Sequence, residues 1–280
     1  MLRRNLSSEF VAGAYVFPGG GVDPGDSGPE VEARCTGLTD AEASDIVEVP
    51  SGGLAFWVAA LRECFEEAGV LVADQPSAHG GPRGRLDLAD PADAARFAGY
   101  RDGVNDGTLS LLEVCEAEDL TLAVDSVHYV ARWITPELAP RRYDTRFFVT
   151  AAPAGQVAHH DDGETIATIW VRPADALARF EGGDIELLPP TIACLRSLVP
   201  HRSTAEVMAW AASVTDIVTV LPIVLIADGQ VLILRPGDSG YEEALADRQA
   251  SGPRDPDQLA DDAEVARSAW GNYRTPRTST

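Results

Sequence analysis

The 280-residue sequence is 45% hydrophobic, which is enough for a folded chain with a sizeable core. Its 44 acidic residues outnumber its 22 basic residues, and the formal net charge of -22 argues against nucleic acid or an anionic membrane as a partner. All 22 basic residues are Arg, so a catalytic lysine that forms a Schiff base or binds phosphate is excluded. Four scattered Cys residues and the lack of a long apolar segment predict neither a zinc site, a disulfide framework nor a membrane anchor, and they favour the cytoplasm.

The chain opens with a short strand and a glycine-rich turn. Residues 1–4 (Met-Leu-Arg-Arg) are typical of the end of a strand, and residues 17–20 (Phe-Pro-Gly-Gly) are typical of a turn after a strand. A phosphate group or a metal ion can approach the backbone of Gly19 and Gly20 because no Cβ stands in the way. Both glycines are therefore candidate substrate-binding residues.

Residues 27–53 form a segment rich in Gly, Pro, Ser and acidic residues. Within it, residues 38–43 predict a short capped helix. The sequence leaves two roles open for the segment, because it could close as a lid over a neighbouring site or lie on the surface as a passive loop.

Residues 60–70 (Ala-Leu-Arg-Glu-Cys-Phe-Glu-Glu-Ala-Gly-Val) predict a helix that ends at its glycine. Glu63, Glu66 and Glu67 are spaced i, i+3 and i+4, which places three carboxylates on one face within a single turn. Carboxylates this close repel each other, and a divalent cation such as Mg²⁺ or Mn²⁺ would turn that repulsion into coordination. We therefore expect these three to be metal ligands and Arg62 to brace one of them; the alternative is a solvated helix face.

Further elements follow from the apolar patterns. Helices are expected at residues 92–100 and 109–115, strands at 127–134, 146–151 and 166–171, and helices at 173–180, 190–198 and 203–212. Strands flanked by helices in this way predict an α/β fold in which helices cover both faces of a mixed sheet.

Arg and aromatic residues are interleaved in residues 140–148 (Pro-Arg-Arg-Tyr-Asp-Thr-Arg-Phe-Phe). Arg side chains bind phosphate oxygens and aromatic rings stack on bases, so this segment is a candidate edge for nucleotide recognition, with Arg146 as its substrate-binding residue. The alternative is that Phe147 or Phe148 belongs to the core while the Arg side chains lie on the surface.

The C-terminal part begins with a hairpin. Apolar runs at residues 217–227 and 230–234 are joined by Asp228-Gly229, a strong signal for a two-residue β-turn. The hairpin is expected either to pair with the edge of the sheet or to form a contact in a homodimer. Residues 252–280 are polar and predict disorder, apart from a short helix at residues 262–269.

Two distant segments together resemble the Nudix box. In that family the box reads Gly, five residues, Glu, seven residues, Arg-Glu, an apolar residue, any residue, Glu-Glu, any residue, Gly and an apolar residue. Residues 62–70 match the second half, and Gly20 with Asp26 in place of Glu matches the first half. Asp26 and Arg62 are separated by 35 residues instead of seven, so the box is split.

A box split in this way resembles the Nudix type 19 branch, the coenzyme A diphosphatases, over roughly residues 3–200. The resemblance implies a Nudix-type α/β/α sandwich with a mixed sheet. The implied organisation is a Nudix hydrolase domain at 1–200 with the insertion at 27–53, a helix and hairpin extension at 201–238, and a disordered tail at 239–280. Family members carry a fuller strand before Leu-Arg-Arg, so the sequence leaves open whether its N-terminus is truncated.

The resemblance also implies a second catalytic segment. Residues 159–164 (His-His-Asp-Asp-Gly-Glu) combine the residue types of a metal site with the composition of a loop, and we expect the two His to be solvated. In Nudix proteins a Glu just before a strand with an aromatic residue such as Trp170 sometimes acts as a further metal ligand or a general base. The implied catalytic residues are Glu63, Glu66, Glu67, Arg62 and Glu164.

Coenzyme A-cleaving members show an Arg, a second Arg five residues later, a Gly four residues after that, and Phe-Pro-Gly-Gly a further four residues on. Arg4, Gly13 and residues 17–20 fit these positions, whereas Glu9 stands where the second Arg belongs. Arg4 is therefore a further candidate for substrate binding, and Glu9 predicts a weakened preference for coenzyme A.

The implied reaction is hydrolysis of the pyrophosphate bond in a nucleoside diphosphate linked to a group X, with coenzyme A or an acyl-coenzyme A as the candidate. A water activated by Mg²⁺ or Mn²⁺ would attack phosphorus, and Glu63 or Glu164 would take the proton. Two alternatives are a Nudix enzyme for ADP-ribose or dinucleotides and a ligand-sensing Nudix module without turnover. The intact Glu trio argues against the sensing module.

Overall fold

The computed structural model describes residues 1–6, 13–77, 81–137, 142–161, 163–227 and 230–251. The chain divides into two compact units. The first contains Met1–Tyr129 and Phe148–Val214, and the second contains Val130–Phe147 and Thr215–Thr280.

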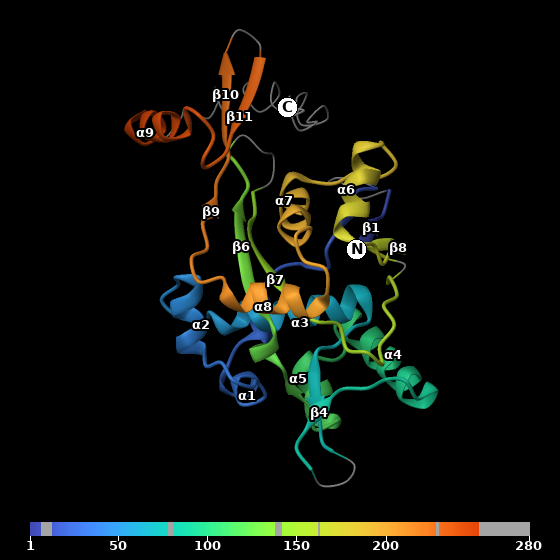
Figure 1. The fold of residues 1–280 in the computed structure, drawn as a ribbon. Helices are drawn as coiled ribbons and strands as arrows, with labels where there is room; N and C mark the ends of the chain where they lie inside the picture. Colours follow the sequence, from blue (N-terminus) through green and yellow to red (C-terminus); the bar gives the residue numbers. More distant parts are fainter. Residues whose placement is uncertain (7–12, 78–80, 138–141, 162, 228–229, 252–280) are drawn as a thin grey trace. The chain divides into compact units, whose positions relative to one another are not determined.

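Helices form the framework of the first unit (Figure 1). Its described α-helices are α1 (Pro29–Glu32), α2 (Asp40–Val47), α3 (Leu54–Ala68), α4 (Pro91–Asn105), α5 (Leu111–Ala117), α6 (Pro173–Glu181), α7 (Pro189–Leu198) and α8 (Thr204–Ser213). Pro24–Asp26 (η1) and Val124–Ser126 (η2) form single 3-10 turns. The helical patterns of the sequence from residue 92 to residue 212 are confirmed, with ends that differ by a few residues.

The strands form several small sheets. β1 (Leu2–Arg4) pairs antiparallel with β2 (Tyr15–Val16) and β8 (Thr165–Thr168), while β3 (Ala73–Gln75) lies between β4 (Gly84–Arg85) and β5 (Thr121–Leu122). β6 (His128–Ile134) lies between β7 (Asp144–Val149) and β9 (Thr219–Val220), which runs parallel to it. The described strands thus include parallel and antiparallel pairs, as the predicted mixed α/β class requires.

Helix α3 is the centre of the first unit. Its buried side chains include Leu54, Trp57, Val58, Leu61 and Phe65. The indole Nε1 of Trp57 donates to the carbonyl of Val127 at 2.9 Å, and its ring meets Phe148 edge-on at a centroid distance of 4.9 Å. α3 ends where the sequence predicts. Gly69 follows its last residue with a φ of 68°, in the left-handed region that residues with a Cβ rarely adopt.

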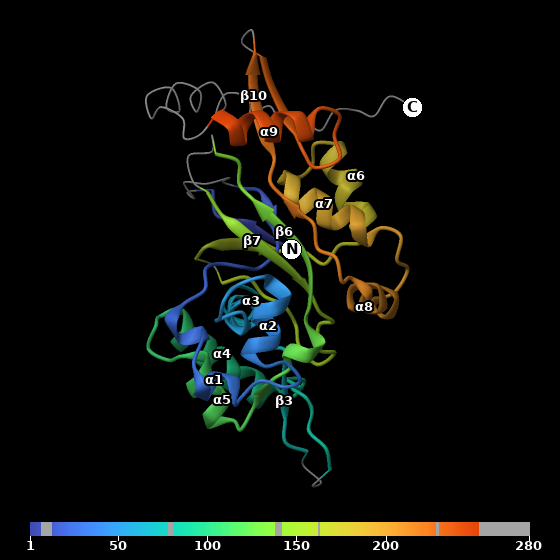
Figure 2. The same ribbon diagram turned by 90° about the vertical axis from the view of Figure 1, so that its left-hand side faces the viewer.

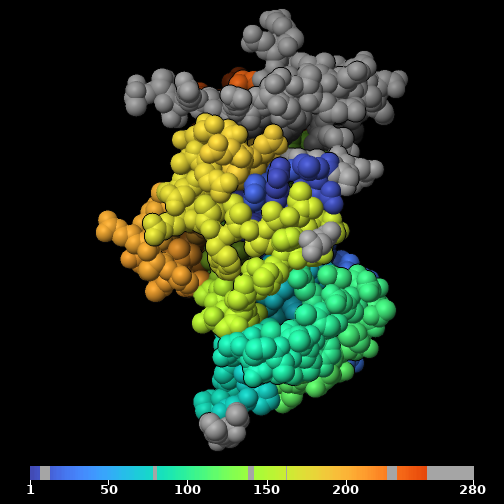
Figure 3. Space-filling model, turned by 90° about the vertical axis from the view of Figure 1, so that its right-hand side faces the viewer, coloured from blue at the N-terminus to red at the C-terminus, as the bar shows by residue number. Residues whose placement is uncertain are grey.

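Helices α4 and α5 follow α3 in the chain, and their apolar residues add to the core of the first unit. Phe97 and Val104 of α4 and Val114 of α5 are buried, and α4 packs directly on α3. The space-filling view shows the residues of the two helices as one continuous surface (Figure 3). This pair corresponds to the two helices that the sequence predicts at residues 92–100 and 109–115.

The segment 27–53 folds into α1 and α2. The hydroxyl of Thr39 accepts the Glu42 N–H, and the Glu42 carboxylate accepts the Thr39 N–H, so a capping box starts α2. Ala43 and Val47 are buried, and α2 packs beside α3 (Figure 2). The segment is thus a packed part of the first unit. Whether it acts as a lid over the site stays a prediction.

Asp40 of α2 also caps α3. Its carboxylate accepts the N–H of Gly52 at 3.0 Å and the N–H of Leu54 at 3.1 Å. The first N–H groups of a helix have no partner within the helix, so these bonds stabilise the start of α3. A Cβ at Gly53 would lie 2.3 Å from the backbone N of Ser44, so the contact between the two helices requires glycine.

The start of the glycine turn, residues 17–21, is held by a second apolar cluster. Its buried members are Ala176, Ile185, Leu187, Ile192 and Leu195, from α6, α7 and the segment between them. Tyr15 and Phe17 pack against this cluster, and the N–H of Tyr15 donates to the carbonyl of Glu186 at 2.9 Å. These contacts hold the residues that lead into the glycine turn.

In the second unit, β10 (Ile223–Ala227) and β11 (Gln230–Leu234) form the predicted hairpin, whose turn residues 228–229 lie outside the described part. Ile223, Leu234 and Tyr241 form a small core with α9 (Tyr241–Ser251). Residues 241–251 of the expected disordered tail are thus helical, and the predicted helix at 262–269 lies outside the described residues. The homodimer contact stays a prediction.

None of the helices in the described ranges combines the length and the apolar character needed to cross a bilayer. The cytoplasmic location stays a prediction from the sequence.

Replacing Asp40 by Ala is expected to destabilise the first unit by about 1–2 kcal/mol, because the N–H groups of Gly52 and Leu54 lose their acceptor. Urea unfolding at neutral pH measures the effect. Asp45→Ala, which removes an exposed carboxylate from the same helix, serves as the matched control. Equal stability of the two variants would show that the cap contributes nothing.

Candidate active site

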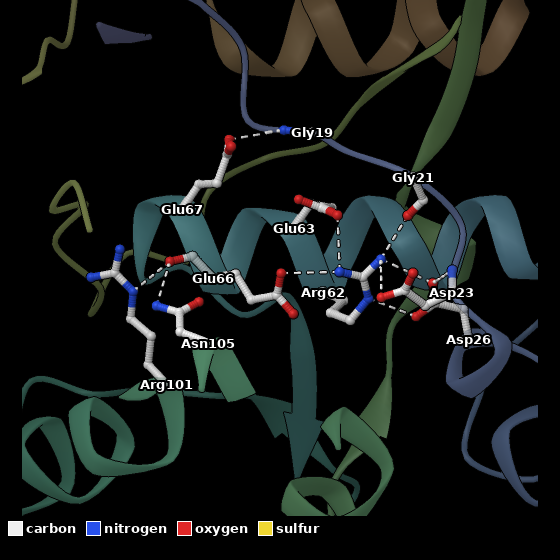
Figure 4. A network of polar contacts seen from close by, with 10 residues as sticks. All are labelled: Gly19, Gly21, Asp23, Asp26, Arg62, Glu63, Glu66, Glu67, Arg101 and Asn105. Atoms are coloured by element: carbon white, nitrogen blue, oxygen red, sulfur yellow. Dashed lines mark hydrogen bonds and ion pairs between the residues drawn. The ribbon is translucent and has the colours of Figure 1, made fainter. Parts of the chain in front are cut away.

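The glycine turn lies directly against the Glu-rich turn of α3 (Figure 4). The N–H of Gly19 donates to Oε2 of Glu67 at 3.0 Å. A Cβ added to Gly20 would stand 2.3 Å from Oε1 of Glu63, so this close approach of backbone and carboxylate requires glycine. The structure thus brings together the two halves of the split motif, which are far apart in the sequence.

Arg62 joins the two halves. The residue is only 8% exposed, and its guanidinium binds the carboxylate of Asp26 through two bonds, from Nε at 2.8 Å and from Nη2 at 3.0 Å. Nη1 donates to Glu63 at 2.9 Å and to Glu66 at 3.0 Å, and Nη2 donates to the carbonyl of Gly21 at 2.7 Å. The sequence predicted that Arg62 braces one carboxylate, and the structure shows it holding three.

Burial and charge act on these groups in opposite directions. Burial would lower the pKa of Arg62, but the hydrogen bond and charge of Asp26, with Glu63 and Glu66, raise it overall, so the guanidinium stays ionised. Burial raises the pKa of Glu63 and of Glu66, and Arg62 offsets only part of that rise.

Glu67 is the most strongly shifted of the three. Burial raises its pKa to about 7, the hydrogen bond from Gly19 opposes the rise, and the charges of Glu63, Glu164 and Asp161 add to it. A carboxyl group with this pKa is partly protonated at neutral pH. A positive charge placed at this point would return it to the ionised form.

Glu164 acts electrostatically on this turn of α3 although it lies about 100 residues from the helix in the sequence. It directly precedes β8, and its charge acts on the pKa of both Glu63 and Glu67. Asp161 acts on Glu67 as well.

Asp161 and Arg101 contact or act on residues of the site, but the sequence analysis did not identify either of them. Asp161 stood within a segment singled out for its residue types, and an Asp four residues before a strand Thr is a signal for a local turn that could have identified it. Arg101 of α4 donates from Nε to the carbonyl of Glu66 at 2.8 Å, where Asn105 lies at 3.4 Å. No local pattern marks this contact, because it depends on how α4 packs on α3.

The two Arg residues predicted to bind substrate lie in different units. Arg4 is on β1, where it pairs with Thr165, the residue after Glu164. Arg146 lies in the second unit, where its guanidinium is 3.5 Å from the carboxylate of Asp144. It is therefore not among the residues that the first unit brings together, and its substrate-binding role stays a prediction. Phe148 packs edge-on against Trp57, but the Arg146 side chain is only 5% exposed, so it does not lie on the surface as the alternative required.

The predicted metal ligands have suitable chemistry but do not converge on one point. Arg62 holds Glu63 and Glu66, while Glu67 reaches toward Gly19 (Figure 4). Within the described ranges, no three Asp, Glu, His or Cys side chains are gathered closely enough to hold a metal ion. The raised pKa values of the three Glu residues nevertheless mark a place where a hard cation would relieve repulsion.

Comparisons with known proteins agree with the split motif. A family model described as NUDT19 Nudix domain matches residues 29–198. The acyl-coenzyme A diphosphatase NUDT19 of Homo sapiens is 29% identical over 272 residues, which cover 87% of this chain and 72% of that protein. Its counterpart from Gallus gallus is 26% identical over 272 residues, covering 86% and 72%.

Among solved structures, the crystal structure of a NUDIX hydrolase from Alicyclobacillus acidocaldarius matches with a TM-score of 0.55 at 26% identity, covering 74% of this chain and 86% of that one. These findings confirm the predicted fold class and the predicted resemblance. The family match begins at residue 29, after the glycine turn, so the place of that turn in the site rests on its contacts with α3.

Replacing Glu67 by Gln is expected to stabilise the fold at pH 8 but not at pH 4. The pKa of Glu67 is about 7 in the fold against an ordinary value of 4.5, so its ionisation costs stability as the pH rises through this window and costs nothing below it. The neutral Gln removes a cost on the order of 3 kcal/mol at pH 8. Urea unfolding in the presence of a chelator at the two pH values measures the change.

Glu116→Gln on α5 is the control, since Glu116 is exposed and does not act on the pKa of Glu67. An equal gain at both pH values, or none at pH 8, would contradict the raised pKa.

Proposed function

Because the chain belongs to the NUDT19 Nudix domain family and is a Nudix hydrolase, we propose that it cleaves the pyrophosphate bond of coenzyme A or an acyl-coenzyme A in a reaction that depends on Mg²⁺ or Mn²⁺. The products would be 3′,5′-ADP and phosphopantetheine or its acyl ester. The observation that carries the proposal is the approach of Gly19 and Gly20 to the carboxylates of Glu67 and Glu63.

This contact supports phosphoanhydride chemistry for a physical reason. Backbone without side chains lies against a set of buried carboxylates whose pKa values are raised by burial and by one another. A phosphate group can reach this point without a steric obstacle, but its negative charge needs a cation between it and the Glu side chains. A metal-bound diphosphate satisfies both conditions.

Glu63, Glu66 and Glu67 are the residues we assign to the metal. When bound, the divalent cation lowers the pKa of a water and offsets charge on the pyrophosphate oxygens. The chain itself contributes Arg62, which keeps Glu63 and Glu66 in place from the buried side through its bonds to Asp26. Side chains held this firmly lose little freedom when a ligand binds.

Glu63 and Glu164 are both candidates for taking the proton from the attacking water. Arg62 donates to Glu63 and thereby favours its ionised form, while Glu164 is exposed and can reach solvent after the reaction. A base must be ionised before it accepts a proton, so these features suit both residues for the role.

The substrate part of the proposal rests on the relatives and on Arg4. Both relatives described above carry the name acyl-coenzyme A diphosphatase. Arg4 lies on the strand next to β8, opposite the residue that follows Glu164, and its Nε is buried and donates to no atom of the described residues. A phosphate group of the substrate would give this nitrogen a partner.

Glu66→Gln and Glu67→Gln should each lower the rate of hydrolysis by a factor on the order of 10³, because each removes one metal-binding charge. The assay incubates coenzyme A and acyl-coenzyme A with Mg²⁺ or Mn²⁺ and identifies the products by mass. Glu116→Gln, on the exposed side of α5, should keep the full rate.

Full activity of both variants would show that the metal assignment is wrong. Turnover of ADP-ribose or a dinucleotide, with both coenzyme A substrates inert, would keep the chemistry and replace the substrate. Binding of a diphosphate without turnover by the unaltered protein would indicate the sensing module.

Glu9→Arg is expected to raise kcat/KM for coenzyme A relative to dephospho-coenzyme A. Residue 9 lies outside the described residues, so this prediction rests on the sequence, where Glu9 stands in place of an Arg. A gained Arg to phosphate contact contributes on the order of 2 kcal/mol, which corresponds to tens of fold. Glu9→Gln separates the loss of the negative charge from the gain of the guanidinium; an unchanged ratio in Glu9→Arg would refute the prediction.

A further inference from the structure

Asp161 builds the turn that leads into β8. Oδ2 of its carboxylate accepts the N–H of Glu164 at 3.0 Å. Oδ1 accepts the N–H of Thr165 at 2.9 Å and the hydroxyl of Thr165 at 2.6 Å. One side chain therefore fixes the backbone of two successive residues, the first of which carries the carboxylate that belongs to the site.

The turn is also tied to its surroundings on both sides. The carbonyl of Glu164 accepts the N–H of Asn5 at 2.9 Å, and the Asn5 side chain donates to the carbonyl of Gly163 at 3.0 Å. On the other side, the N–H of His159 donates to the carbonyl of Ala68 at the end of α3. The segment that carries Glu164 is thus anchored to the same helix that carries Glu63 and Glu67.

The negative charge of Asp161 lies among other carboxylates that repel it. Its carboxylate adds to the repulsion that raises the pKa of Glu67, together with Glu63 and Glu164. Burial acts to raise the pKa of Asp161, but hydrogen bonds from Thr165 and the neighbouring backbone lower it overall, so the group is ionised at neutral pH. An ionised group among like charges is tolerated here because it accepts three hydrogen bonds from the turn.

We propose that Asp161 is a positioning residue for the hydrolytic reaction: by binding the backbone of Glu164 and Thr165, it fixes the turn that carries Glu164, which is itself anchored to the end of α3. This inference rests on the proposed function for its effect on rate. Its structural part, the hold of Asp161 on the turn, is independent of any substrate.

A double-mutant cycle tests whether Asp161 acts through Glu164. Asp161→Ala should lower kcat roughly tenfold or more while changing KM less than about threefold, because a displaced catalytic group affects the reaction step more than binding. In the Glu164→Ala background the same substitution should have almost no further effect. Asp161→Asn keeps one acceptor for Thr165 but presents an amide to the Glu164 N–H, so an intermediate loss is expected, and this variant serves if Asp161→Ala does not fold.

Asp90→Ala is the matched control. Asp90 caps α4 by accepting the N–H of Ala92 at 2.8 Å, and it is not among the groups that act on Glu67, so its loss should leave kcat unchanged. An equal loss of kcat from Asp161→Ala with and without Glu164 would overturn the proposal, as would unchanged kcat in Asp161→Ala or in Glu164→Ala.

Amide hydrogen exchange of Glu164 and Thr165 provides a readout that needs no activity. Both amides should exchange about tenfold faster in Asp161→Ala and not in Asp90→Ala. Unchanged exchange would refute the positioning role. If the unaltered protein cleaves no diphosphate, the proposed function fails, and exchange still decides whether Asp161 holds the turn.

Discussion

The buried guanidinium of Arg62 is the interaction on which the site depends. It binds Asp26 from the glycine-rich side and both Glu63 and Glu66 from α3, and it also reaches the carbonyl of Gly21. A buried charge without its partners costs several kcal/mol, so each of these contacts keeps the others in place. Because Arg62 binds both Glu63 and the carbonyl of Gly21, it holds the Glu63 carboxylate against the glycine turn.

The split of the motif is compatible with this arrangement because the inserted segment packs on the helix it precedes. α2 lies beside α3, and Asp40 accepts the N–H groups of Gly52 and Leu54 at the start of α3. The insertion leaves the turn after Asp26 and returns at the beginning of α3, so Asp26 and Arg62 still meet. The insertion thus contributes stability to the helix that carries the chemistry.

The carboxylates of the site repel one another, and local hydrogen bonds hold the residues that carry them in place. Gly19 restrains Glu67, Arg62 restrains Glu63, and the turn at Asp161 restrains Glu164. Each of these restraints is a hydrogen bond to the backbone or to one cation, and none of them neutralises the excess negative charge of the site. The pKa of Glu67 is raised because it is buried and because the neighbouring carboxylates repel its charge. Such a site is prepared for a positive ligand without being closed around one.

Local signals in the sequence determined the helix with its Glu spacing, its end at Gly69, the hairpin at residues 223–234 and the family, because all of these depend on neighbours in the chain. The strands of two or three residues, such as β2 and β9, are too short to carry a periodic pattern. Only the tertiary structure brought Asp161 and the backbone of Gly19 to α3 and kept the three Glu carboxylates from converging. Helical spacing fixes which side chains share a face, whereas the approach of distant loops and the partners of Arg62 depend on how the whole first unit packs.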